Sequence, residues 1–322
     1  TALPSWAGTL EITGTPLALL VSSWVLGRLA VGLASQLPVP LVGFLDLCFP
    51  LLFVALTAPG MRRVTLAYKL GLTVIVAGFF FGNLWYYLGV IQQDQQLWSQ
   101  GLRLGLYAMI FHCSVTVGIL APIFTETALE GKGSPATIGH KPLIEWLSAL
   151  FIVALAVADL ANFPATVIGV LALVCSLLHA LRLARWRSLD IADTPIVWVL
   201  HLGYAWLCLA LLLFAGNRLG LPIDSKSWVH AFTMGGFGLM SLGLMIRVSR
   251  KHTGRPLHVP TPMIFAFLML TLATMVRILL PLTSLRSELL LLSAAMWALA
   301  YLTYLFQCWR LLLAPSLPHK TS

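Results

Sequence analysis

Residues 70–93 read LGLTVIVAGFFFGNLWYYLGVIQQ, and no Asp, Glu, Lys or Arg interrupts them. Residues 104–125 form a second stretch of this kind. An α-helix rises about 1.5 Å per residue, so about 20 apolar residues are enough to cross the hydrocarbon core of a bilayer. Both stretches are therefore predicted to be transmembrane helices.

The rest of the chain has the same apolar character. Of its 322 residues, 59% are hydrophobic and 10% are charged, and the mean hydropathy is +0.91. Soluble domains carry about 25% charged residues. We therefore expect a lipid bilayer, not water, to surround most of the chain. The net charge of +9 sits in short loops, which indicates membrane topology and not nucleic-acid binding.

The uncharged stretches predict an all-α fold: one integral membrane domain over residues 1–322, built as a polytopic bundle of about ten spans. Four glycines crowd the eighth span, where they favour close helix packing. The expected spans are 16–35, 39–58, 67–90, 103–124, 142–160, 164–184, 194–216, 226–248, 260–281 and 287–312.

The loops between these spans predict the orientation of the chain. An even number of spans places both termini on one face, and 14 of the 20 Lys and Arg residues fall on that face. Short cytoplasmic loops carry an excess of Lys and Arg. Both termini are therefore predicted to be cytoplasmic.

Charged residues inside spans are costly and usually have a partner or a function. Asp46 and Asp159 lie inside the expected helices, as do Arg28 and Arg277. One interpretation is that each carboxylate forms a structural ion pair with Arg28 or Arg277. The other is that the carboxylates belong to a proton or ion path.

Histidines inside the spans suggest a metal or haem site. His179 and His201 lie on helices of opposite direction and could share one depth, whereas His112 falls near the bilayer middle. Neutral imidazole binds copper, zinc and haem iron, and haem propionates need cationic partners. A buried histidine hydrogen-bonded to a serine or a carbonyl is the alternative without metal. The candidate cations are Arg28, Arg247, Arg255 and Arg277.

Two stretches carry a specific resemblance. Residues 195–207 read PIVWVLHLGYAWL, and residues 229–257 read VHAFTMGGFGLMSLGLMIRVSRKHTGRPL. Together they closely resemble the NnrS family of bacterial membrane proteins. The resemblance implies a multi-pass protein of the bacterial inner (cytoplasmic) membrane that contains haem b and copper. It also implies a link to nitric oxide and to protection from nitrosative stress.

Carried over residue by residue, the resemblance points to His201, His230 and His252, with Arg247 and Arg255 beside them. Family members usually open with two further helices bearing a His-x-His-Glu type motif, so we expect this chain to hold part of the family's site. The expected cofactor-binding residues are His201, His230, His179, His252, Arg247, Arg255 and Arg28. The expected metal ligands are His201, His230 and His112.

Three functions compete at this point. The first is an NnrS-like haem and copper protein that responds to nitric oxide through a metal centre held by intramembrane histidines. The second is a polytopic transporter or permease with structural histidines, and the third is a non-catalytic assembly partner. An enzyme that reduces nitric oxide would need an electron donor and a proton path, and the sequence identifies neither.

Overall fold

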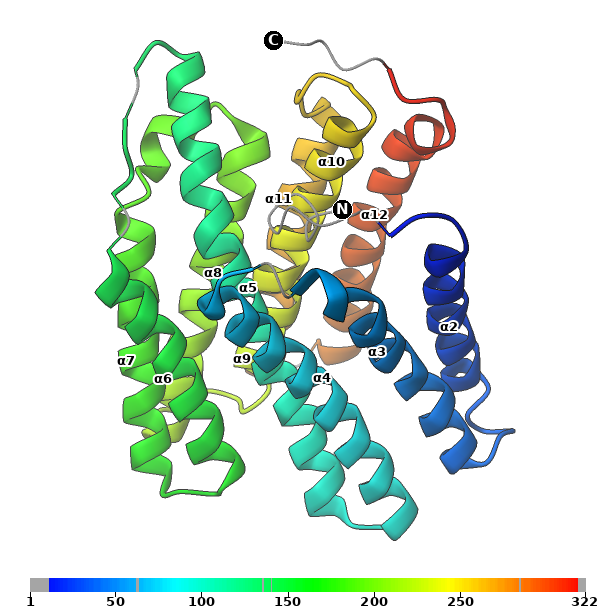
Figure 1. The fold of residues 1–322 in the computed structure, drawn as a ribbon. Coiled ribbons are helices and arrows are strands. Elements are labelled where there is room, and N and C mark those ends of the chain that lie inside the picture. Colours follow the sequence, from blue (N-terminus) through cyan, green and yellow to red (C-terminus); the bar gives the residue numbers. More distant parts are fainter. Residues whose placement is uncertain (1–11, 62–63, 135, 140, 284, 318–322) are drawn as a thin grey trace. The chain divides into compact units, whose positions relative to one another are not determined.

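Every regular element in the described part of the chain is a helix. The computed structural model describes residues 12–61, 64–134, 136–139, 141–283 and 285–317. Ten helices in these ranges are long and apolar enough to cross a membrane. The predicted all-α architecture with about ten spans is therefore confirmed, and the described residues contain no β-strand (Figure 1).

The first compact unit ends at His112. In it, the buried Asp46 of α3 forms an ion pair with Arg28 of α2 and accepts a hydrogen bond of 3.1 Å from Tyr87 of α4. The predicted structural pair between Asp46 and Arg28 is thus confirmed. The unit's helices are α2 (Gly14–Gly32), α3 (Val39–Met61), α4 (Leu66–Gln92) and the first half of α5 (Gln95–Gly131).

The second compact unit begins at Cys113 and contains the rest of α5. Within it α7 packs on α8, and α11 packs on α12 (Figure 1). Its further elements are α6 (Pro142–Leu160), α7 (Ala165–Ala184), η1 (Ser188–Ile191), α8 (Pro195–Arg218), α9 (Ser227–His230), the π-helix η2 (Ala231–Phe237), α10 (Gly238–His252), α11 (Thr261–Leu279), η3 (Leu280–Leu282) and α12 (Arg286–Leu313).

Helix α8 is the central helix of the second unit. Of its most apolar 18-residue window, 67% is buried, against 17% for α12. Glycines of η2 and α10 bring the next span close to it. A Cβ added at Gly235 would lie 2.6 Å from the ring of Trp206, and one at Gly243 would lie 2.6 Å from Val199 Cγ1. The predicted close packing of these glycines is confirmed.

The structure corrects the bounds of the fourth predicted span and the predicted partner of Asp159. The fourth span, predicted at 103–124, is one helix over Gln95–Gly131, because the helix continues past the apolar core that hydropathy detects. Asp159 pairs with Arg218 at 2.8 Å, whereas the expected partner was Arg28 or Arg277. Arg218 lies just beyond the expected span 194–216, but a long basic side chain at a helix end can reach back along the helices to a carboxylate.

Candidate functional site

His179 lies fully buried on α7, and protein groups occupy both of its ring nitrogens. Its Nδ1 is 2.8 Å from the carbonyl oxygen of Cys175, and its Nε2 is 2.9 Å from Ser114 Oγ on α5. A carbonyl oxygen can only accept, so Nδ1 carries the proton. In the neutral ring Nε2 then accepts the proton of the Ser114 hydroxyl.

His201, near the start of α8, is held in the same way. Its Nε2 lies 2.9 Å from Thr125 Oγ1, and its Nδ1 lies 2.8 Å from Ser188 Oγ. Thr125 gives its own proton to the carbonyl of Ala121 at 2.7 Å, so it accepts from His201 Nε2–H. In the neutral ring, Nδ1 therefore accepts the proton of Ser188.

A buried guanidinium stands beside His179. Arg182 forms an ion pair with Glu145 of α6, and its side chain is only 5% exposed. It also donates to the carbonyl of Ser114 at 2.7 Å and to the hydroxyl of Tyr204 at 3.0 Å. Gly118 makes room for it, because a Cβ at that position would overlap the guanidinium. The charge is thus paired and hydrogen-bonded, as burial requires.

Two aromatic rings connect the histidines. The ring of Tyr204 stacks on that of His179, with 5.7 Å between the ring centroids. The ring centroid of Trp186 lies 5.4 Å from that of His201 and 4.5 Å from that of Tyr204. The rings of Tyr204 and Trp186 therefore lie between His179 and His201. The expected shared depth is wrong, because their partners Ser114 and Thr125 are eleven residues apart on α5, or about 16 Å along the helix. We call these two residues the inner histidine pair.

His230 has different surroundings, at the end of α9 where the chain enters the π-helix η2. It lines a cavity of about 470 Å³, which we call the His230 pocket. Single π-helical turns inside membrane-length helices occur frequently at functional sites. The pocket's charged and polar lining comprises His230, Asp224, Lys226, Ser227, Arg277, Arg286 and Ser287, and Leu280, Pro281 and Leu290 add apolar walls.

The ring of His230 is half-buried, and no described residue forms a hydrogen bond with it. The lining of the pocket carries more positive than negative charges: three cations, Lys226, Arg277 and Arg286, against the carboxylate of Asp224. A neutral imidazole at this place has a free nitrogen lone pair, and the surrounding cations favour an anionic ligand. Such a donor set fits a metal-containing group that carries carboxylates.

The structure does not bring His201 and His230 together. The rings of Phe214 and Trp228 lie 4.4 Å apart, which places His230 level with a position on α8 well beyond His201. The offset along α8 is roughly 11 residues, or about 16 Å. Among the described residues, no group of three or more His, Cys, Asp and Glu side chains could hold a metal ion.

A family model described as NnrS protein matches residues 1–316. The chain belongs to the NnrS family. Comparison with curated proteins and with solved structures gave no match. The expected family membership is therefore confirmed.

The other predicted site residues of this NnrS chain have surroundings of their own. His252 is exposed at the end of α10, and Arg255 lies 3.3 Å from a neighbouring backbone carbonyl. The buried guanidinium of Arg247 lies 3.5 Å from the centre of a phenylalanine ring on α5. His112 is half-buried at the end of the first unit, and Arg28 is held by the α2–α3 ion pair.

Several residues around the inner histidine pair were missed in the NnrS sequence. Arg182 and Glu145 lie inside the expected spans 164–184 and 142–160, but neither was among the expected site residues. The helical spacing held a signal, because Arg182 follows His179 by three residues and so shares its face of the helix. Ser114 and Gly118 are likewise one turn apart on α5.

Proposed function

We propose that this NnrS protein is a haem protein of the bacterial cytoplasmic membrane that acts in the response to nitric oxide. The haem would bind at the His230 pocket, with His230 as the ligand of the iron. The observation that supports this is the unbonded imidazole of His230 beside three cationic side chains in a cavity. The inner histidine pair offers no comparable lone pair.

The residues of the pocket fit the chemistry of haem. Haem iron takes a neutral histidine nitrogen, and its two propionates take cationic partners. The volume of about 470 Å³ falls within the usual 300–1,000 Å³ of small-molecule sites. The same pocket therefore offers an imidazole nitrogen that would hold the iron, cationic partners for the propionates, and apolar walls.

Each lining residue has a distinct role in this proposal. A bound haem would supply an iron atom that takes nitric oxide as a ligand. His230 would present its nitrogen to that iron from the start of η2. Arg277 and Arg286 would bind the propionates, and Leu280 and Leu290 would keep water from the macrocycle.

The described residues do not fit a copper site equally well. Copper would need two or three nitrogen or sulfur donors at one point. Both ring nitrogens of His179 and of His201 are already in hydrogen bonds, and the described residues form no group of three donors. We therefore assign no copper ligands.

The test is an absorption spectrum of the purified chain expressed with a haem supply. The unaltered protein should show a Soret band that shifts when nitric oxide is added without oxygen. H230A should lose the band. H258A removes an exposed histidine of the α10–α11 loop, so it should keep the band and serves as the matched control.

Two results would contradict the proposal. One is an unaltered protein that folds but binds neither haem nor iron. The other is full haem content in H230A. The first result would favour a transporter or permease with structural histidines, a function to which the hydrogen-bonded inner pair is also suited.

A further inference from the structure

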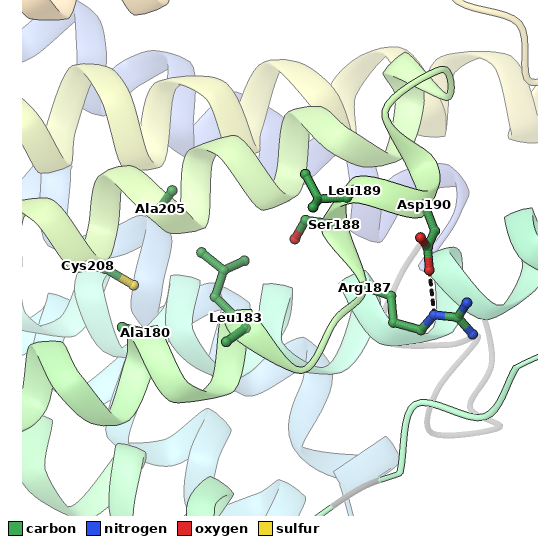
Figure 2. A pocket seen from close by; sticks show the side chains of 9 residues that line it. Ala180, Leu183, Arg187, Ser188, Leu189, Asp190, Ala205 and Cys208 are labelled. Atoms are coloured by element: carbon green, nitrogen blue, oxygen red, sulfur yellow. Dashed lines mark hydrogen bonds and ion pairs between the residues drawn. The ribbon is translucent and has the colours of Figure 1, made fainter.

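A second cavity, which we call the α7–α8 groove, opens between these two helices. Its volume is about 500 Å³, and its composition changes along its length. Figure 2 shows small apolar side chains at one end, Ser188 between, and the Arg187–Asp190 pair at the other end. The apolar part is lined by Ala180, Leu183 and Ala184 of α7 and by Ala205 and Cys208 of α8.

Small side chains create the apolar part of the groove. Three of its five apolar lining residues are alanines on facing helices, so the space between the helix backbones stays unfilled. On the outer face of α7, Leu177 and Leu181 are 59% and 50% exposed. A groove with these walls between two spans suits a hydrocarbon chain.

Ser188 gives the groove a hydrogen-bond acceptor. Its hydroxyl proton goes to Nδ1 of His201 at 2.8 Å, and the lone pairs of its oxygen remain available to the cavity that it lines. Ser188 can therefore only accept a hydrogen bond from a ligand in the cavity. Its own proton stays on the bond to His201, because His201 is 4% exposed and is itself held by Thr125. A ligand at this position should therefore offer a hydroxyl as donor.

The charges at the polar end are already balanced. Arg187 pairs with Asp190 at 2.6 Å, and Lys132 pairs with Asp193. Lys132 also donates to the backbone carbonyl of Asp190 at 2.9 Å. No surplus cation is therefore present in this cluster to bind the phosphate of a lipid. The balance favours a head group without charge.

We propose that the α7–α8 groove binds a membrane quinol, a neutral hydroquinone head group with an isoprenoid tail. The hydroxyl of the head group donates to Ser188 Oγ, and the tail lies along Ala180, Ala184 and Ala205. The residues involved are separate from the His230 pocket, so the binding does not depend on haem.

The experiment measures binding of decylubiquinol, kept reduced, to the full chain in phosphatidylcholine nanodiscs by titration calorimetry. Saturable binding at one site per chain is expected. A205L fills the groove and should weaken binding at least roughly tenfold, and S188A should weaken it by roughly tenfold through loss of the acceptor. A165L enlarges an exposed alanine at the far end of α7 and should leave the affinity unchanged.

The same titration separates this proposal from its competitors. H230A should bind the quinol as well as the unaltered protein, so a failure of the haem assignment leaves this result intact. Circular dichroism and gel filtration must show that each variant is folded. Absence of saturable binding, or unchanged affinity in folded A205L, would overturn the proposal. So would displacement of the quinol by added phosphatidylethanolamine or phosphatidylglycerol, which would make the groove a phospholipid site.

Discussion

The inner histidine pair and the His230 pocket contain the same kind of side chain inside the same unit, but they differ in what the imidazole touches. His179 and His201 each have both ring nitrogens in hydrogen bonds to serine, threonine or backbone oxygen. His230 faces a cavity and has no such bond among the described residues. A histidine's role in a membrane bundle is thus set by the hydroxyl and carbonyl groups on facing helices.

A hydrogen-bonded histidine contributes to stability, whereas a histidine with a free nitrogen is available to bind a ligand. Polar groups buried between helices must find partners, and once satisfied they hold the helices in one arrangement. A group that keeps its lone pair for a ligand gives up that contribution. We therefore expect substitutions around the inner pair to lower stability, and substitutions in the His230 pocket to remove the cofactor with little change in stability.

The largest effect is expected from Arg182. R182M removes the cation that faces Glu145 and leaves that carboxylate without its partner between α6 and α7. Loss of one member of a buried ion pair costs about 3–5 kcal/mol. Reversible unfolding in mixed micelles should record a loss of this size.

Two further variants make the Arg182 measurement decisive. The double variant R182M/E145Q removes both charges and should recover part of the loss. R185A removes a cation three residues further along the chain, outside the buried network, and should change stability little. Equal losses in R182M and R185A would show that the inner region depends on general basic charge and not on this pair.

The second-largest loss of stability is expected from a substitution of Gly118. A Cβ at this position would overlap the guanidinium of Arg182, so G118A should force the network apart. Overpacking a buried site costs up to about 3 kcal/mol. G131A lies on the same helix with open space around its added carbon, and it provides the matched control in the same unfolding assay. Unchanged stability in G118A would mean that the guanidinium can move at low cost.

The sequence predicted the fold well because lipid leaves few alternatives. Spans such as 142–160 could be placed to the residue, since hydropathy and a proline at the start of the helix agree. The extra turns of α5 escaped detection, because they lie in polar sequence outside the hydrocarbon core. The π-helix η2 was not predicted either, because the apolar and glycine pattern of its sequence is equally compatible with an α-helix.

The candidate site was predicted only in part. His230 and its neighbour Arg277 could be named from depth and from the family resemblance, and they line one pocket. The partners of His201 could not, because Thr125 and Ser188 are distant in sequence and are ordinary residues in helices and turns. Pairing between distant helices depends on rotation about each helix axis, which hydropathy does not determine.

Substitutions at Thr125 and at His230, measured side by side, test the contrast between the inner histidine pair and the His230 pocket. T125V keeps the shape of the side chain but leaves His201 Nε2–H without its acceptor, which should cost about 1–3 kcal/mol. Haem content should not change. H230Q should show the reverse, with loss of haem and little change in the apoprotein's stability. T127V, on the exposed face of the same helix, is the control for T125V.

The smallest effect is expected at the loop beside Ser188, where the hydrogen bond from Lys132 lowers the pKa of Asp193 below its usual 3.8. A carboxylate with a lowered pKa stabilises the fold above its usual pKa, and this contribution is lost as the pH falls through the folded value. Asp193 is exposed, so K132M should lower the unfolding midpoint only slightly at about pH 6, and the difference should shrink as the pH falls below 3.8. D193N should behave in the same way. A large, pH-independent loss in K132M would mean that Lys132 stabilises the loop through its hydrogen bond to the carbonyl of Asp190 and not through the charge of Asp193.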